Sequence, residues 1–167
     1  MKIFFVNQRR TYEAEKRNSC LWSPKLGKSG RKNPGYELMR EVCKGDFILN
    51  NAGGEIAAIS IAEQGCQPGR RPWGVEDKRG DYDWGSDGWL IPAAYYELLH
   101  PLRISDLTEA WLGGGSAKDS AFIVEPRTQY LCNLAPHHAR YILKEILRHE
   151  ESERVKDIAN CALAECN

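Results

Sequence analysis

The sequence predicts an α+β domain, in which a small curved sheet or half-closed barrel carries short helices at its rim and a C-terminal helix. Apolar, strand-like runs dominate the first part of the chain, and short helical patterns separate them. A sustained amphipathic stripe of helical period begins only near Pro136. In a barrel this small, side chains or one small ligand fill the mouth.

Each expected strand is an apolar run bounded by turn or cap residues. The two runs joined by Gly53 and Gly54 are the clearest, because adjacent glycines between apolar runs are typical of a tight hairpin. Pro92 indicates an edge or a bulge, since proline cannot donate a ladder hydrogen bond. The expected strands are KIFFVN (2–7), CLWS (20–23), FILNN (47–51), EIAAISIAEQG (55–65) and WLIPAAYYELLHP (89–101).

The expected helices are short until the C-terminal part of the chain. Thr11 is the expected N-cap of a helix over 12–16, and Asn33 precedes a proline at the start of the next helix. Between the strands, segment 65–88 is too long for an ordinary connection and is expected to be a functional loop. The other expected helices cover 105–112 and begin near Pro136. The weakly amphipathic segment 149–167 is interpreted as a helical linker or the start of a following region, so the domain is expected to span 1–148.

Composition limits the classes of protein to which the chain can belong. Its 167 residues suffice for one domain with a real core, and 42% apolar with 28% charged residues is typical of a globular protein. No apolar run approaches the roughly 20 residues of a membrane span, and the opening apolar segment is too short for a signal peptide. We therefore expect a cytoplasmic protein.

Charge is balanced overall but unevenly distributed. Because 23 basic residues offset 23 acidic ones, the chain is not expected to coat nucleic acid through charge alone. The first 32 residues are nevertheless rich in lysine and arginine. This surface is either solvated or faces phosphates, and the candidates for phosphate contact are Arg9, Arg10, Lys25, Lys28 and Arg31.

The sequence contains no recognisable metal or catalytic motif. Its six cysteines include no CxxC pair, and the adjacent His137 and His138 cannot share a metal ion from one helix face. The GxSxG, HExxH and GxxxxGK motifs are absent. We expect a binding module without metal or cofactor, and no catalytic residues in this chain.

Three expected strand ends carry polar residues, and one of them places an indole beside a hydroxyl. They supply Asn7 with Gln8, Trp22 with Ser23, and Asn50 with Asn51. If the ends converge, they form a pocket with amide and hydroxyl groups on its wall and an indole on its face. Such a pocket suits a flipped base, which is read by stacking and by hydrogen bonds to its edge. The alternative is that Trp22 is an ordinary core residue.

Ordered sequence blocks over about residues 1–148 resemble the EVE domain, a member of the PUA-like superfamily that also includes YTH and SRA domains. The blocks are FFVNQ, TYEAE, LWSPK, KGDFILN, EIAAISIA and a tryptophan five residues before that of GWLIP. The blocks LWSPK and RKNPGY and the spacing of Trp84 and Trp89 are most similar to the N-terminal EVE domain of bacterial HNH endonucleases that cut modified DNA.

The resemblance implies a reader of 5-methylcytosine or 5-hydroxymethylcytosine that flips the base into an aromatic pocket. Its partner would be modified double-stranded DNA, and the domain would give specificity to a modification-dependent, type IV-like restriction system. An HNH nuclease domain would lie outside these residues. The implied pocket residues are Trp22, Ser23, Asn7, Gln8, Asn50 and Trp84, with Trp73 as the alternative second wall. The other function left open is a stand-alone YTH-like reader of modified RNA, such as RNA with N6-methyladenosine, or of a small nucleotide-like ligand.

Overall fold

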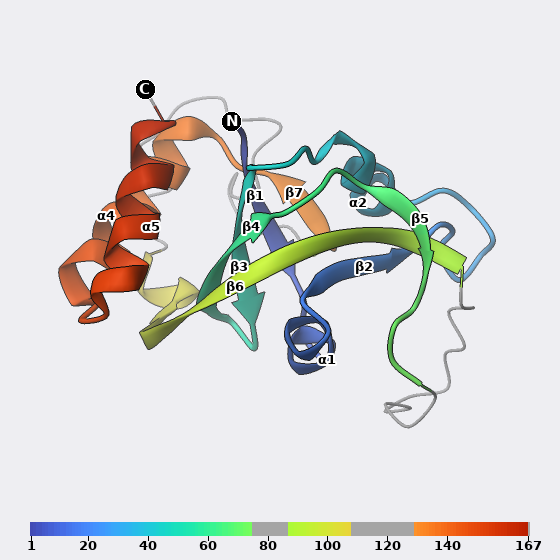
Figure 1. The fold of residues 1–167 in the computed structure, drawn as a ribbon, viewed down its shortest axis with the longest axis horizontal. Helices are drawn as coiled ribbons and strands as arrows, with labels where there is room; N and C mark the ends of the chain where they lie inside the picture. Colours follow the sequence, from blue (N-terminus) through green and yellow to red (C-terminus); the bar gives the residue numbers. More distant parts are fainter. Residues whose placement is uncertain (75–86, 108–128, 167) are drawn as a thin grey trace.

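The computed structural model describes residues 1–74, 87–107 and 129–166, and within them a curled mixed sheet forms a half-barrel (Figure 1). The expected fold class is therefore confirmed. The helices are α1 (Tyr12–Arg17), α2 (Pro34–Glu37), α4 (Pro136–His149) and α5 (Glu153–Ala164), with 3-10 turns η1 (Leu38–Glu41) and η3 (Ile104–Leu107). The strands are β1 (Ile3–Asn7), β2 (Cys20–Pro24), β3 (Phe47–Ala52), β4 (Glu55–Ala62), β5 (Gln67–Arg70), β6 (Asp87–Arg103) and β7 (Leu131–Asn133).

The long strand β6 organises the sheet. The strand order is β2-β6-β4-β3-β1-β7, with β5 also paired to β6. Only the β1–β3 pair is parallel among the described strands. The first part of β6 pairs with β2 and β5, and the rest pairs with β4, so this strand runs across most of the molecule (Figure 1).

Pro92 lies inside the sheet rather than at its edge, because β6 has neighbours on both sides. It pairs in register with Cys20 of β2, and on its other side the ladder with β5 ends at Leu90 while the ladder with β4 begins at Ala93. The carbonyl of Pro92 accepts the N–H of Glu63 (2.8 Å). Proline is tolerated here because its missing donor falls where one neighbouring strand gives way to the next.

Alternation along the strands divides the core into two layers. In β1, Ile3 and Phe5 join one cluster with α4 and α5, whereas Phe4 and Val6 join another with Met39 of η1. Successive side chains of a strand point to opposite faces, so a strand covered on both faces is apolar throughout. This explains the uninterrupted apolar run at the start of the chain.

The segment 149–167, expected to be a linker or the start of a following region, packs onto the domain within the described residues. Val155, Ala159 and Ala162 of α5 lie in the same core cluster as α4. The amino group of Met1 forms an ion pair with Glu165 (3.0 Å). Helix α5 therefore shares the core of the domain in this structure. Figure 1 shows it beside α4. No described helix has the length and apolar character needed to cross a membrane.

The local expectations differ in outcome. The hairpin between β3 and β4 is confirmed, with Gly53 and Gly54 at φ of 65° and 86°. Asn33 caps α2 as expected, since its Oδ1 accepts the N–H of Gly35 (2.9 Å). The hydroxyl of Thr11 instead donates to the carbonyl of Gln8 (2.8 Å), so Thr11 makes no side-chain cap.

Two loop and helix expectations need revision. The expected loop 65–88 contains strand β5, and its residues 75–86 lie outside the described part. The expected helix at 105–112 is a 3-10 turn in the residues that the structure describes, and the remainder falls outside them.

Candidate functional site

Of the polar residues expected at three strand ends, Gln8 after β1 and Asn50 of β3 meet in a buried amide network, whereas the side chains of Trp22 and Ser23 on β2 lie outside it. The Gln8 Nε2 group donates to Glu15 Oε2 (2.6 Å) and to the hydroxyl oxygen of Tyr95 (2.7 Å). Its Oε1 accepts from Nδ2 of Asn50 (2.9 Å). Gln8 and Asn50 are 1% and 0% exposed. In this structure both amides are therefore engaged inside the protein.

Two tyrosine hydroxyls bond the outer edge of β2. Tyr130 donates to Glu15 Oε2 (2.6 Å) and accepts the backbone N–H of Trp22 (3.1 Å). Tyr95 donates to the carbonyl of Cys20 (2.9 Å). Strands β2 and β7 stand at the two ends of the strand order, and Tyr130 directly precedes β7. Side chains, rather than a strand ladder, thus connect the two ends of the half-barrel.

Glu15 is the ionisable residue at the centre of this network. Burial raises its pKa to about 7, although the hydrogen bonds that it accepts from Tyr130 and Gln8 act in the opposite direction. Burial and the neighbouring Glu15 also raise the pKa values of Tyr95 and Tyr130 well above 10. The tyrosines are therefore neutral at pH 7, whereas burial brings the pKa of Glu15 close to neutral pH.

Sequence reasoning did not single out Glu15, Tyr95 or Tyr130. A signal was present for Glu15, which stands three residues after the buried Tyr12 and so lies on the buried face of α1. Nothing in the chain indicates that Tyr130, which is 115 residues away from Glu15, donates to that carboxyl group.

Trp22 is buried, with 5% of its surface exposed, so the expectation that it faces an open pocket is wrong for this structure. Its indole N–H donates to the carbonyl of Gly69 (3.1 Å), and Trp73 lies edge-on with ring centroids 5.8 Å apart. The guanidinium carbon of Arg71 lies 5.9 Å from the ring centroid. On the β6 side, a Cβ at Gly88 would come within 2.4 Å of the indole, so glycine is required there. Residues 69–73 and β6 therefore enclose Trp22.

Ser23 does not share a face with Trp22. Neighbouring side chains of a strand point to opposite faces, and Ser23 is paired in register with Trp89 of β6. Its hydroxyl oxygen is buried and has no hydrogen-bond partner among the described residues. A ligand would therefore have to reach the indole and the hydroxyl from different sides of β2.

Asn7 lies apart from the buried network and secures the segment before β7. Its Nδ2 donates to the carbonyl of Gln129 (2.6 Å), and its Oδ1 accepts from Nδ2 of Asn51 (2.7 Å). Of the two candidates for a second aromatic wall, Trp73 contacts Trp22, whereas Trp84 lies outside the described residues.

The basic residues predicted to contact phosphate form two groups. Arg9 and Arg10 are exposed in the turn between β1 and α1, and Lys28 and Arg31 are exposed on the connection after β2. Lys25 is already engaged, because its Nζ lies 3.0 Å from Asp87 and 5.1 Å from the centroid of Trp89.

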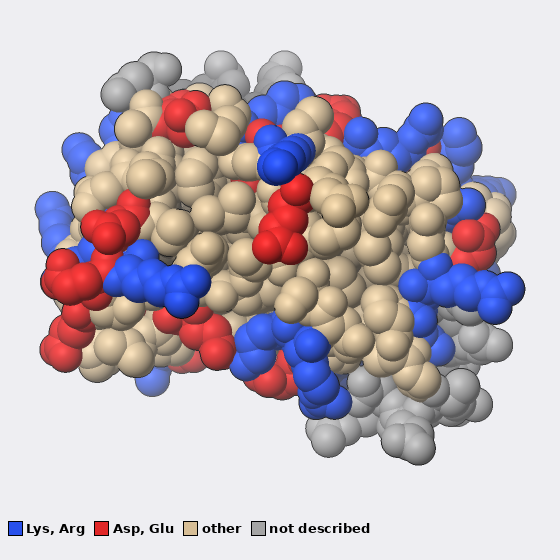
Figure 2. All heavy atoms as spheres, viewed as in Figure 1, with Lys and Arg blue, Asp and Glu red and all other residues tan. Residues whose placement is uncertain are grey.

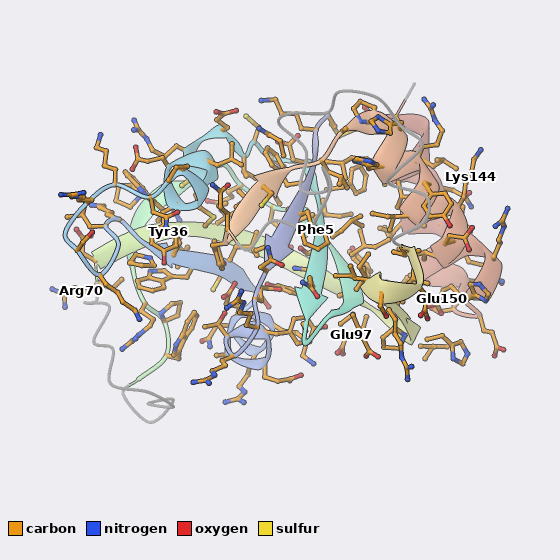
Figure 3. All side chains as sticks on the ribbon, turned by 180° about the vertical axis from the view of Figure 1, so that it is seen from behind. Phe5, Tyr36, Arg70, Glu97, Lys144 and Glu150 are labelled. Atoms are coloured by element: carbon orange, nitrogen blue, oxygen red, sulfur yellow. The ribbon has the colours of Figure 1, made fainter. Side chains whose placement is uncertain are left out.

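Strand β5 adds two cations that the sequence analysis missed. Arg70 ends the strand and extends outward in Figure 3, and Arg71 follows it over Trp22. The Nε of Arg71 is buried and has no hydrogen-bond partner within the described ranges. Figure 2 shows lysine and arginine gathered at the end of the molecule formed by β5 and the connection after β2, whereas the end formed by α4 and α5 carries both signs. Among the described residues, the β5 end is therefore the aromatic and basic one.

A hollow of about 460 Å³ lies at the opposite end of β6. It contains none of the predicted pocket residues, and its lining side chains include His100, Arg103 and His149. Among the described residues, no three His, Cys, Asp or Glu side chains are grouped so that they could hold a metal ion. The aromatic and basic β5 end thus remains the stronger candidate site.

No family model and no curated protein matches the sequence, but solved structures match the fold. An ASCH protein from Zymomonas mobilis aligns with a TM-score of 0.53 at 7% identity, over 86% of this chain and 94% of that one. A protein from Pseudomonas putida aligns with a TM-score of 0.57 at 12% identity, over 87% of this chain and 99% of that one. A hypothetical protein from Leishmania major aligns with a TM-score of 0.58 at 9% identity, over 89% of this chain and 96% of that one. At this identity the likeness is one of fold, and the fold is PUA-like.

Proposed function

We propose that this PUA-like domain binds nucleic acid at its β5 end and reads a modified base with Trp22. In line with the EVE resemblance, the proposed target is duplex DNA with 5-methylcytosine or 5-hydroxymethylcytosine, whose base is flipped out of the stack. The domain would act as the specificity module of a modification-dependent restriction enzyme, with the nuclease outside these residues. The observation that carries the proposal is the pairing of Trp22 with Trp73 beneath the guanidinium of Arg71.

Aromatic rings next to cations are the combination that unstacked bases require. Stacking of a base on an aromatic side chain contributes about 1–3 kcal/mol, and nearby arginine and lysine side chains bind the backbone phosphates. Arg71 supports this role because a buried guanidinium nitrogen without a partner among the described residues can donate to a phosphate or a base carbonyl. A local basic surface would also allow a chain whose net charge is zero to bind nucleic acid.

The burial of Trp22 adds a condition to the proposal. A base can stack on the indole only if Trp73 moves from its edge-on position, because residues 69–73 cover the ring in this structure. Edge-to-face aromatic pairs contribute about 0.5–1.5 kcal/mol, which is less than or comparable to base stacking. Stacking of a base on Trp22 would therefore offset the loss of this aromatic pair. The base would then lie between Trp22 and Trp73.

The test compares one sequence in several chemical forms. Fluorescence anisotropy would measure the binding of plain, 5-methylcytosine and 5-hydroxymethylcytosine duplexes, and of RNA with and without N6-methyladenosine. We expect a modified duplex to bind most tightly, and Trp22→Ala to lose that preference by about 1–3 kcal/mol while retaining binding to plain DNA. Preference for the methylated RNA instead would support the stand-alone RNA reader. Equal affinity for all the probes would overturn modified-base reading.

Folding must be measured on the same preparations, because Trp22 is a buried side chain. Deleting a large buried aromatic destabilises a domain by about 3–5 kcal/mol. Trp22→Phe provides a milder variant, since it keeps an aromatic face and loses the hydrogen bond to Gly69. Lys144→Ala on α4 is the surface control and should leave all affinities unchanged.

A further inference from the structure

We infer that Tyr130 and Glu15 are positioning residues for Trp22, and that ionisation of Glu15 strengthens the preference for the modified base. This inference rests on the proposed function, because it concerns the same base-binding strand. Neither residue needs to touch the nucleic acid. They act through the backbone N–H of Trp22, which Tyr130 holds at the outer edge of β2.

The backbone groups on the outer edge of β2 are hydrogen-bonded by the hydroxyls of Tyr130 and Tyr95. The N–H of Ala93 in β6 donates to the carbonyl of Ser19, so alternate residues of this segment turn their backbone groups toward β6. The N–H of Trp22 belongs to the other set and faces away from β6, where it meets the Tyr130 hydroxyl at 3.1 Å. A buried N–H left unpaired costs about 1–3 kcal/mol. Tyr130 therefore fixes the strand at the residue that carries the indole.

The protonation state of Glu15 affects the strength of the hydrogen bond between Tyr130 and the N–H of Trp22. The Tyr130 hydroxyl donates to Glu15 Oε2 at 2.6 Å while it accepts from Trp22. Hydrogen bonds to a carboxylate are stronger than those to a neutral acceptor, and successive bonds in a chain polarise one another. Ionised Glu15 thus draws the Tyr130 proton toward itself and makes the phenol oxygen a better acceptor for the N–H of Trp22.

The titratable surroundings of Glu15 leave it as the group that changes charge near neutral pH. Tyr95 from β6 and Tyr130 before β7 keep their protons, because their pKa values are well above 10. Burial raises the pKa of Cys20 on β2 to about 12, and that of Tyr12 on α1 lies above its ordinary value. Gln8 at the end of β1 is neutral at every pH. The charge of this cluster between pH 6 and pH 8 therefore follows Glu15.

The experiment measures the ratio of affinities for modified and plain duplex between pH 6 and pH 8.5. In the unaltered protein we expect the ratio to rise through pH 7. Glu15→Gln should hold it at the low-pH value, because glutamine keeps the shape and one acceptor without titrating. Tyr130→Phe should lower it roughly three- to tenfold at pH 8, the equivalent of one hydrogen bond. Tyr96→Phe, on β6 but in the core beside α4 and α5, is the matched control and should follow the unaltered protein.

The outcomes separate this inference from the proposed function. No preference at any pH in the unaltered protein would remove the proposed function. A preference with the same pH profile in the unaltered protein and Glu15→Gln would overturn the positioning role alone. If Tyr130→Phe fails to fold, Glu15→Gln decides the question, because it retains both tyrosines. Binding to plain DNA, measured in parallel, reports any general loss of structure.

Discussion

At the scale of single residues, Glu15 buries an ionisable carboxyl group and also accepts hydrogen bonds that organise its surroundings. Its carboxyl group is fully buried, and burial disfavours the ionised form. Three donors nevertheless depend on it or on its partner: Gln8 Nε2, the Tyr130 hydroxyl and, through that hydroxyl, the N–H of Trp22. Glu15 Oε1 and Asn50 Oδ1 have no hydrogen-bond partner among the described residues, so the network compensates only in part for the burial of an ionised carboxylate.

Stability should therefore fall as pH rises through 7. The pKa of Glu15 rises from 4.5 to about 7 on folding, so the folded state holds its proton more tightly than the unfolded state. The resulting stability is fully present below pH 4.5 and is lost as pH passes 7, with a total of about 3 kcal/mol. Glu15→Gln should remove this dependence and gain stability relative to the unaltered protein between pH 5 and pH 8.5. Urea unfolding at pH 5 and pH 8.5 would measure the free energy of unfolding of both proteins. If the difference between the two free energies is the same at both pH values, the raised pKa of Glu15 is contradicted.

Ser23 offers a second test at this scale. Because its buried hydroxyl has no partner among the described residues, Ser23→Ala should change the free energy of unfolding by less than about 1 kcal/mol, or increase it. If the hydroxyl contacts the bound base, the same change should weaken binding to modified DNA by about 0.5–1.5 kcal/mol. Thermal melting and anisotropy on one sample distinguish these effects. Unchanged binding would leave Ser23 without a role in base reading.

At the scale of elements, the sequence predicted those parts whose pattern is local. The hairpin of β3 and β4 and the apolar run of β1 follow from periodicity and from Gly53 with Gly54. Strand β5 could not be recognised, because Pro68 and Gly69 disfavour a strand and only pairing with β6 defines it.

The site shows the same division between local and distant information. The convergence of Gln8 and Asn50 followed from their positions at the ends of neighbouring strands. The covering of Trp22 could not be predicted in this way, because Gly69 and Trp73 approach it from segments distant in the sequence. Contacts over such separations leave no periodic signal in the chain.

The segment after β5 should contribute to base binding through Trp73. Trp73→Ala removes one wall for the base, worth about 1–3 kcal/mol, and also removes the edge-on pair that must open, worth about 0.5–1.5 kcal/mol. The first effect is the larger, so we expect weaker binding of the modified duplex with a smaller loss than for Trp22→Ala. Stopped-flow measurement should also show faster association, because the cover is gone. Tighter equilibrium binding would mean that Trp73 only covers Trp22.

At the scale of the whole molecule, the described residues of the two ends differ in charge, while the net charge of the chain is zero. The β5 end presents Arg70 and the cations after β2, whereas α4 and α5 mix acidic and basic side chains. An oriented charge distribution can direct a polyanion to one end without a basic excess over the chain. The position of the surface charges, rather than their sum, should therefore determine binding.

A pair of charge reversals with equal net change tests this directly. Lys28→Glu with Arg70→Glu alters the β5 end, and Lys144→Glu with Arg148→Glu alters α4 by the same total charge. The first pair should weaken binding to modified and plain DNA alike, because phosphate contacts carry no information about the base. The slope of log affinity against log salt should fall by about 1.8, since each lost phosphate contact removes about 0.9. The α4 pair should leave both the slope and the affinity close to those of the unaltered protein, because exposed charges there face no nucleic acid. Equal losses from the two pairs would show that net charge governs binding and would place the interface elsewhere than at β5.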